Sequence, residues 1–196
     1  MKLNQLQINA RHLRIVRPDG NCFYRAYALR LIEICRQSPE LALSIKERLS
    51  EAMKTSIMAV YGSGAIDEFY EAFIETLDSQ EDVYKLDTST DLYIVTFMRC
   101  LTSAYLQSHS DEYLPFLDGN FSSVADFCRK NVDPMHRECD QLQITALTSQ
   151  VGVAVEIHYF DRSARETANV IRIPSADSST VITLVYKPGH YDILYT

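Results

Sequence analysis

The sequence predicts an α+β fold, with a helical middle and a mostly antiparallel sheet formed by the C-terminal strands. Helical periodicity dominates the middle of the chain, where apolar residues recur at the spacing of one helix face. From Val151 onward the chain becomes rich in β-branched and aromatic residues, which are typical of strands. Helices followed by a run of strands differ from the alternating order of a doubly wound sheet.

The expected elements follow one another without a repeat or a linker. Residues 13–17 alternate apolar and basic, which indicates a short strand or an extended entry segment. The turn formers Pro18 to Asn21 separate it from a helix over 22–36. Further helices are expected over 38–61, 65–77, 92–107, 122–131 and 141–150, with polar loops at 86–90 and 108–111. Strands are expected over 153–160, 169–174, 180–187 and 190–195, arranged as a meander. A chain of 196 residues is enough for one domain with a proper core, so we expect a single domain over 1–196.

Composition excludes several classes of protein. No apolar run approaches the roughly 18 residues of a membrane span, and residues 1–10 lack the apolar centre of a signal peptide, so we expect a cytoplasmic or nuclear protein. The formal net charge is -7 and the basic residues are scattered, so neither a membrane nor nucleic acid is an expected partner. The acidity either suits a basic partner or only keeps the protein soluble.

The cysteines form no pattern typical of a metal site or a redox pair. None of the five belongs to a CxxC motif. The nearest approach to a metal cluster is Cys128, His136 and Cys139, which lacks a fourth ligand at a suitable spacing. We therefore predict no metal and no cofactor, and we expect Cys35, Cys100, Cys128 and Cys139 to be core or surface thiols.

Cys22 differs from the other cysteines because it follows a turn and opens a helix. The first turn of a helix offers unpaired N–H groups and the positive end of the dipole, and both favour a thiolate. Asn21 or Asp19 can cap the helix, and Gly20 gives the loop conformational freedom. The same loop, Gly20 and Asn21, offers N–H groups of the kind an oxyanion hole requires. The alternative is that Cys22 is simply a buried helical residue.

His190 is the histidine best placed to act as a base. It follows the turn Pro188-Gly189 and opens a strand, so that Asp192 shares its face and can orient the imidazole. The alternative is a hairpin pair that serves solubility. Among the other histidines, His12, His109 and His136 are expected at the surface, and His158 within a strand.

Two motifs together resemble the otubains, a branch of the ovarian-tumour family of deubiquitinating cysteine proteases. They are RPDGNCFYRA (Arg17 to Ala26) and YKPGHYDILY (Tyr186 to Tyr195), and the segments 91–107 and 132–147 between them also resemble otubain sequence. The resemblance extends from about Leu13 to the end of the chain. It implies a papain-like fold and a thiol isopeptidase that cleaves after the C-terminal glycine of ubiquitin, in polyubiquitin chains or ubiquitinated proteins.

The resemblance also implies a role for each site residue. Cys22 would be the nucleophile, His190 the base that later protonates the leaving lysine amine, and Asp192 the group that orients His190. Asp19 matches an active-site position that shapes the oxyanion loop. The implied partners are ubiquitin and polyubiquitin chains, with ubiquitin-conjugating enzymes as a further class, and no cofactor is needed. We expect the helix end and His190 to lower the pKa of Cys22.

The sequence departs from the otubain pattern in two places. Otubains usually carry a longer arm before the cysteine motif, which helps to bind a second ubiquitin, whereas 18 residues precede Asp19 here. No linkage preference is therefore predicted. Gln141 stands where relatives are expected to have histidine, a difference that we place away from the proposed triad.

Two alternative functions are compatible with the same sequence. One is a protein that binds ubiquitin or a ubiquitin-conjugating enzyme without cleavage, and the other is a thiol enzyme for another ubiquitin-like modifier or a small amide. The complete set of Cys22, His190 and Asp192 favours an active enzyme.

Overall fold

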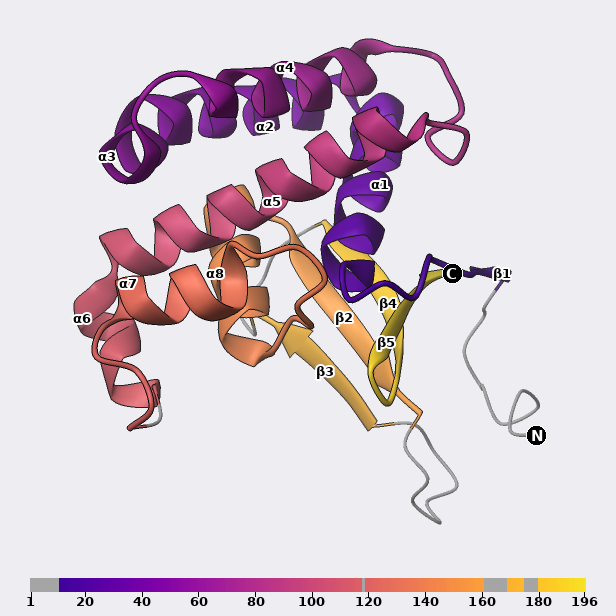
Figure 1. Ribbon diagram of the computed structural model, residues 1–196. Helices are drawn as coiled ribbons and strands as arrows, with labels where there is room; N and C mark the ends of the chain where they lie inside the picture. The colour runs from indigo at the N-terminus through magenta and orange to yellow at the C-terminus, as the bar shows by residue number, and fades with distance from the viewer. Residues whose placement is uncertain (1–10, 118, 161–168, 175–179) are drawn as a thin grey trace.

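The computed structural model describes residues 11–117, 119–160, 169–174 and 180–196. All of the described helices precede residue 152, and four of the five described strands follow it. The predicted α+β fold is confirmed. Figure 1 shows α2, α4 and α5 above the sheet, with α1 and α8 lying between these helices and the strands.

Eight α-helices occur in the described part of the chain, together with three short segments of other helical type. The α-helices are α1 (Cys22–Gln37), α2 (Pro39–Ala52), α3 (Met58–Tyr61), α4 (Ala65–Asp78), α5 (Thr88–Ser108), α6 (Ser110–Tyr113), α7 (Val124–Phe127) and α8 (Gln141–Val151). The other segments are the π-helical turns Met53–Ile57 and Cys128–Val132 and the 3₁₀ turn Leu114–Phe116. The helix predicted over 38–61 is therefore interrupted by a π turn, and the one predicted over 122–131 begins at Val124 and ends in a π turn.

The long helix α5 begins earlier than the sequence pattern indicated. The Asp87 carboxylate accepts hydrogen bonds from the N–H groups of Ser89, at 2.8 Å, and Thr90, at 3.1 Å, and so caps the helix. The polar loop predicted at 86–90 was therefore wrong for its second half, which forms the first turn of α5. The loop predicted at 108–111 was also wrong in part, because α6 begins at Ser110.

The sheet has five strands in the order β1-β5-β4-β2-β3. They are β1 (His12–Arg14), β2 (Ala154–Tyr159), β3 (Asn169–Ile173), β4 (Val181–Lys187) and β5 (His190–Tyr195). Three neighbouring pairs are antiparallel, as predicted, but β2 and β4 run parallel, so the predicted meander was wrong. Burial explains the arrangement: β2 is buried or half-buried along its whole length, whereas β3 has three exposed residues and lies at the edge.

Helix α1 joins the helical layer to the sheet and is buried on nearly every side. The main hydrophobic core combines Phe23 and Ile32 of α1, Phe97 of α5, and Leu184 and Ile193 of the sheet, none more than 1% exposed. Because α1 packs directly on β5, its first residue, Cys22, is carried to the start of the strand that begins with His190. The core therefore fixes where the two predicted site motifs lie relative to each other.

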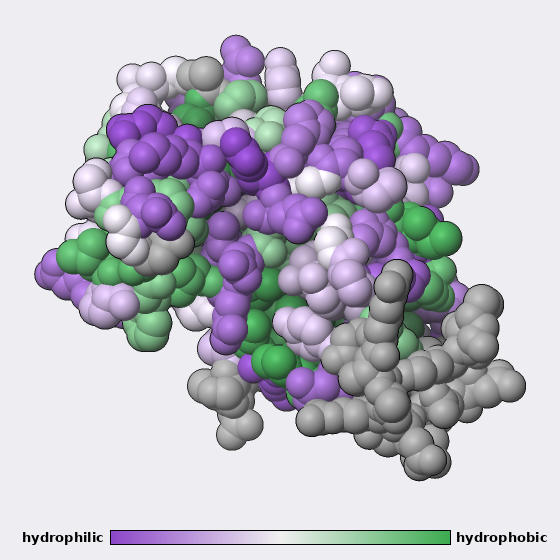
Figure 2. Space-filling view, turned by 60° about the horizontal axis from the view of Figure 1, so that its bottom comes forward, coloured by the Kyte–Doolittle hydropathy of each residue, from purple (hydrophilic) through white to green (hydrophobic). Residues whose placement is uncertain are grey.

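The exposed apolar side chains do not form one continuous patch on the face shown in Figure 2. The face seen in Figure 2 is largely hydrophilic or intermediate in hydropathy, and its hydrophobic residues form several patches. Among the described residues, the large apolar side chains that are exposed are Ile15, Leu43, Met58, Tyr93, Leu114, Phe116, Val170 and Ile171. No helix in the described ranges is both long and apolar enough to cross a membrane.

Candidate active site

Cys22 is the first residue of α1 and borders a pocket of about 320 Å³. Its residue surface is 4% exposed. Gly189 and Tyr191, the neighbours of His190, line the same pocket, and the Tyr191 ring packs against Phe23 at a centroid distance of 5.3 Å. The fold therefore brings the start of α1 to the β4–β5 turn. The remaining lining residues are Glu138, Cys139, Asp140, Gln141, Ile144, Tyr159 and Tyr186.

The turn that carries His190 has the predicted form. β4 ends at Lys187 and β5 begins at His190, so only Pro188 and Gly189 connect the two strands. Gly189 has a φ of +77°, which glycine adopts without strain. His190 Nε2 lies 2.8 Å from Asp192 Oδ1, as expected for alternate residues on one face of a strand.

The hydrogen bonds of Asp192 determine which nitrogen of His190 is basic. An ionised carboxylate only accepts hydrogen bonds, so Nε2 of a neutral His190 carries the proton and donates it to Asp192. The unprotonated nitrogen is then Nδ1. This atom is buried and has no hydrogen-bond partner among the described residues. A buried base without a partner is ready to accept a proton from an incoming acid.

Asp192 is held in its ionised form by three donors. It is 1% exposed, and burial alone would raise the pKa of its carboxyl. The Val16 N–H at 3.0 Å, the Lys187 ammonium at 3.1 Å and His190 outweigh burial, so the pKa of Asp192 is lowered. Val16 precedes the cysteine loop, and its hydrogen bond therefore ties that segment to the histidine strand.

The electrostatics of Cys22 contradict the expected thiolate. Burial raises the pKa of the Cys22 thiol, and the Asp19 charge raises it further. The N–H groups of Tyr191, Phe23 and Cys22 itself lower it, but not enough to reverse the effect of burial. The helix start does act in the predicted direction. It is weaker than desolvation, so the pKa of the Cys22 thiol is raised.

Asp19 anchors the loop before Cys22 through a buried arginine. Arg25 is 4% exposed and its guanidinium donates to both oxygens of Asp19, at 2.7 and 2.9 Å, and to both oxygens of Asp91, at 2.8 and 3.0 Å. Burial alone would raise the pKa of Asp19, but Arg25 and the Asn21 N–H lower it to about 2. Asp19 is thus a fixed anion that shapes the loop.

Gly20 has the conformational freedom that the sequence analysis predicted, and its surroundings require it. Its φ is +76°, and a Cβ at this position would lie 2.6 Å from the carbonyl carbon of His136 and 2.9 Å from its Cα. Only glycine fits this contact without a shift of backbone. His136 is exposed, as predicted, but its Nδ1 lies 2.8 Å from the Asp19 carbonyl oxygen and it packs against the site loop.

Asn21 occupies the N-cap position of α1, but its side chain does not cap the helix. Asn21 Oδ1 instead accepts from Arg99 Nη2 at 2.7 Å and from the His136 N–H at 2.9 Å. Its backbone N–H donates to Asp19 Oδ1 at 3.0 Å and is therefore not available as an oxyanion donor. The backbone N–H groups that lower the pKa of the thiol are instead those of Tyr191, Phe23 and Cys22.

Sequence reasoning missed the buried arginines and their partners. Arg25 and Arg99 lie within helical runs, where a charged residue is normally read as part of a solvated face. One signal was present: Arg99 is the single charged residue between 92 and 107. A lone charge in a long uncharged helix indicates a buried group with specific partners.

The residues considered for a metal lie in different environments. Cys128 is buried in a second core cluster with Phe127 and Val132, whereas Cys139 lines the Cys22 pocket and His136 contacts the site loop. Within the described ranges no group of His, Cys, Asp and Glu could hold a metal ion. All five cysteines are free thiols.

No described histidine is among the residues that line the Cys22 pocket, and only His190 lies between two of them, Gly189 and Tyr191. His12 is exposed, and its ring stacks on Tyr195. His158 lies in β2, as predicted, and its Nε2 contacts Glu156 Oε1 at 2.8 Å. The prediction for His109 was wrong in part, because its ring is half-buried and stacks on Tyr105 at 4.0 Å.

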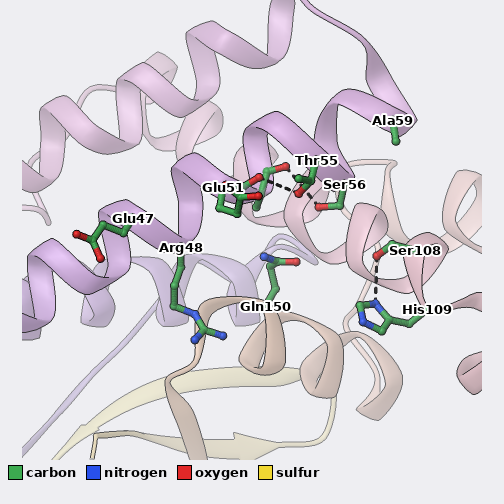
Figure 3. A pocket seen from close by; sticks show the side chains of 10 residues that line it. Glu47, Arg48, Glu51, Thr55, Ser56, Ala59, Ser108, His109 and Gln150 are labelled. Atoms are coloured by element: carbon green, nitrogen blue, oxygen red, sulfur yellow. Dashed lines mark hydrogen bonds between the residues drawn. The ribbon is translucent and has the colours of Figure 1, made fainter.

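A larger pocket of about 700 Å³ lies elsewhere, between the end of α2 and the ends of α5 and α8. Figure 3 shows Glu47, Arg48 and Gln150 around it, with His109 and Ser108 on its far side. It contains no cysteine, and His109 Nδ1 is occupied by Ser108 Oγ and the Tyr105 carbonyl. Its size therefore does not make it the catalytic site.

The comparison with protein families decides the assignment. The family model described as Peptidase C65 Otubain matches residues 1–196. This chain belongs to the otubain family. Relatives of the otubain chain include the "Ubiquitin thioesterase otubain-like" protein of Caenorhabditis briggsae, 34% identical over 99% of this chain and 72% of the relative. Human "Ubiquitin thioesterase OTUB1" is 33% identical over 99% of this chain and 74% of its own length.

Solved structures agree with this family assignment. The otubain chain superposes on an OTUB1 chain from the complex "h/ceOTUB1-ubiquitin aldehyde-UBC13~Ub" with a TM-score of 0.87 at 34% identity, covering 99% of this chain and 80% of that one. It also superposes on the OTUD1 OTU domain with a TM-score of 0.54 at 17% identity, which shows a shared fold. The predicted OTU fold is confirmed.

One departure from the otubain pattern gains importance in the structure. Gln141 was placed away from the proposed triad, but it lines the same pocket as Cys22. It is the first residue of α8, where Asp140 caps the helix and accepts its N–H at 2.9 Å. The difference at position 141 therefore lies within the candidate site.

Proposed function

We propose that this otubain-family chain is a cysteine-dependent deubiquitinase that hydrolyses the bond after the C-terminal glycine of ubiquitin. The substrate is supported by the relatives, which are named ubiquitin thioesterases, and by the superposed OTUB1 complexes with ubiquitin aldehyde. The observation that carries the proposal is the position of Cys22, whose pocket is bordered by the turn that presents the His190–Asp192 pair.

The first half of the reaction forms a thioester. His190 Nδ1 removes the proton from Cys22 Sγ as the sulfur attacks the glycine carbonyl carbon, since burial raises the pKa of the thiol. Negative charge develops on the carbonyl oxygen, near the N–H groups at the start of α1. The tetrahedral intermediate collapses, the C–N bond breaks, and the proton on His190 Nδ1 passes to the leaving lysine amine.

The second half of the reaction restores the enzyme. A water molecule gives a proton to His190 Nδ1 and attacks the thioester carbon. The C–S bond then breaks, His190 Nδ1 returns the proton to Cys22 Sγ, and ubiquitin leaves as a carboxylate after its carboxyl proton passes to solvent. Asp192 holds Nε2–H throughout and stabilises the imidazolium that forms in each half. Asp19 contributes through the loop that it fixes rather than by touching the substrate.

The test is hydrolysis of lysine-linked diubiquitin of each linkage type by the wild type and by two variants. Cys22→Ala and His190→Ala should abolish product formation, because each removes one partner of the proton transfer. Cys139→Ser is the matched control, since this second thiol lines the same pocket and should keep activity. Equal turnover by wild type and Cys22→Ala, or no turnover by wild type on any ubiquitin conjugate, would contradict the proposal.

A second candidate function is binding of a ubiquitin-conjugating enzyme. Several of the superposed OTUB1 complexes contain UBC13 or UBCH5B carrying ubiquitin, which supports this class of partner. Calorimetric titration of Cys22→Ala with a ubiquitin-charged conjugating enzyme tests it. We expect saturable binding of the ubiquitin-charged conjugating enzyme and weaker binding of the uncharged one. The absence of binding to either form would exclude this second function.

We also propose that residues 1–196 form one domain that acts in the cytosol or nucleus. The main core includes residues of α1, α4, α5 and the sheet, which supports a single folding unit. All five cysteines are free thiols, as suits a reducing compartment.

A further inference from the structure

Arg99 lies in the middle of α5 and is 0% exposed. Among the described residues it forms no ion pair with a carboxylate, whereas Arg25 nearby is held by two. Its charge is met by carbonyl oxygens and by the Tyr24 ring, whose centroid lies 4.4 Å from Cζ.

The acceptors of Arg99 belong to the two segments that surround the catalytic cysteine. On one side, Nη2 donates to the Gly20 carbonyl at 3.1 Å, and both Nη2 and Nε donate to Asn21 Oδ1, at 2.7 and 3.2 Å. On the other side, Nη1 donates to the Val132 carbonyl at 2.9 Å and Nη2 to the Arg137 carbonyl at 2.7 Å. One side chain therefore joins the Gly20–Asn21 loop to the 132–137 segment.

Burying the charged side chain of Arg99 costs more free energy than burying an apolar side chain at the same position. Burial lowers the pKa of Arg99 and disfavours its charge, and a buried charge without a counterion is stable only when its hydrogen bonds are satisfied. An apolar side chain would pack α5 at less cost. Hydrogen bonds from a charged donor are, however, stronger and more directional than neutral ones, which favours a role in fixing geometry.

The geometry that Arg99 fixes is the peptide plane before the catalytic cysteine. The carbonyl of the Gly20–Asn21 peptide is bound by Arg99, and the N–H of the same peptide is bound by Asp19 Oδ1. With both ends held, this peptide cannot flip. The next peptide, which carries the Cys22 N–H, is then fixed in direction at the start of α1.

We propose that Arg99 is a positioning residue for the oxyanion site of this enzyme. It holds the Gly20–Asn21 loop so that the N–H groups at the start of α1 point to the oxygen of the tetrahedral intermediate formed at Cys22. The inference rests on the proposed function, because it assigns Arg99 a part in the same reaction. Its support is the set of hydrogen bonds that Arg99 donates to the two segments around Cys22, and it requires no contact between Arg99 and the substrate.

Two reactions of Cys22 separate this role from a general structural one. Hydrolysis of ubiquitin with a C-terminal fluorogenic amide passes through an oxyanion, whereas alkylation by iodoacetamide is a displacement at carbon that forms none. Arg99→Lys keeps the charge but loses the planar fork that reaches several acceptors. We expect it to lower kcat by about 100-fold, with KM and the alkylation rate nearly unchanged.

Arg36→Lys is the matched control. Arg36 also donates to several backbone carbonyls, including those of Thr76 and Glu81, but at a place remote from Cys22. It should keep the wild-type kcat. If Arg99→Lys fails to fold by circular dichroism, Asn21→Ala removes the side-chain acceptor of Arg99 and should show the same separation of hydrolysis from alkylation.

The outcomes distinguish this inference from the proposed function. A wild type that hydrolyses no ubiquitin substrate would contradict the function itself. An active wild type with an equally active, folded Arg99→Lys variant would overturn only the role of Arg99. A parallel loss of hydrolysis and alkylation in folded variants would also overturn it, because it would show a displaced sulfur rather than a displaced oxyanion site.

Discussion

The contact between Gly20 and His136 allows a sharp prediction for Gly20→Ala. Gly20 has a φ of +76°, and the added methyl carbon would meet the His136 backbone at 2.6 to 2.9 Å. Both partners are backbone, so neither can move without displacing its segment. The loop before Cys22 must then shift, and the N–H groups at the start of α1 shift with it.

The expected size follows from two contributions. Left-handed backbone costs a residue with a Cβ about 1–2 kcal/mol relative to glycine. Relief of the overlap with His136 adds about 1–3 kcal/mol, as in overpacked cores. Gly20→Ala should therefore lower the free energy of unfolding by about 2–5 kcal/mol, a large part of the roughly 5–15 kcal/mol of a typical domain. Gly62→Ala is a control without the overlap, because Gly62 also has a positive φ, +71° with a ψ of -165°, and no atom lies within 4 Å of the added carbon.

The assay compares urea unfolding and diubiquitin hydrolysis for the two alanine variants. Gly62→Ala should lose about 1–3 kcal/mol and keep its kcat. Gly20→Ala should lose more stability, and at a urea concentration where it is still folded its kcat should fall by at least about tenfold. Equal stability losses for the two variants, together with an active Gly20→Ala enzyme, would refute the account of this loop.

Three further predictions concern the charged groups of the site. Asp192→Asn should lower kcat by about 10²–10⁴-fold in diubiquitin hydrolysis, because an amide N–H facing Nε2 moves the His190 proton to Nδ1; an unchanged kcat would contradict the assigned tautomer. The iodoacetamide reaction of Cys22 should have its pH midpoint above that of a free cysteine peptide, because burial raises the pKa of the thiol; a midpoint below the peptide's would restore the thiolate interpretation. Asp19→Asn should cost up to about 2 kcal/mol of unfolding free energy near pH 7, because the pKa of Asp19 is lowered from 3.8 to about 2. Since a lowered carboxyl pKa stabilises the protein above its unfolded value, the difference from wild type in urea unfolding should shrink as the pH falls from about 4 towards 2, and a constant difference would contradict it.

The parts of the site that depend on local sequence could be predicted. Cys22 follows four turn formers and opens an apolar helix, and Pro188-Gly189 precedes a strand in which His190 and Asp192 alternate. Each of these signals depends on residues only a few positions apart, so backbone preferences and strand periodicity are enough to read them.

The parts that depend on distant contacts could not be predicted. The pKa of Cys22 is decided by desolvation, and burial of a helix start depends on what packs over it. Arg99 reaches Gly20 and Val132, which are remote in sequence, so its partners are visible only in the fold. The parallel pairing of β2 with β4 likewise follows from the edge position of β3 rather than from any single strand.

The most direct test of the central claim is the reaction of the protein with ubiquitin that carries a thiol-reactive C-terminal electrophile. Intact mass should show one ubiquitin per chain, and peptide mapping should place the adduct on Cys22, with no adduct on Cys139 in the same pocket. Cys22→Ala should remain unmodified. An adduct on another cysteine, or no adduct under conditions in which a known deubiquitinase reacts completely, would contradict the account.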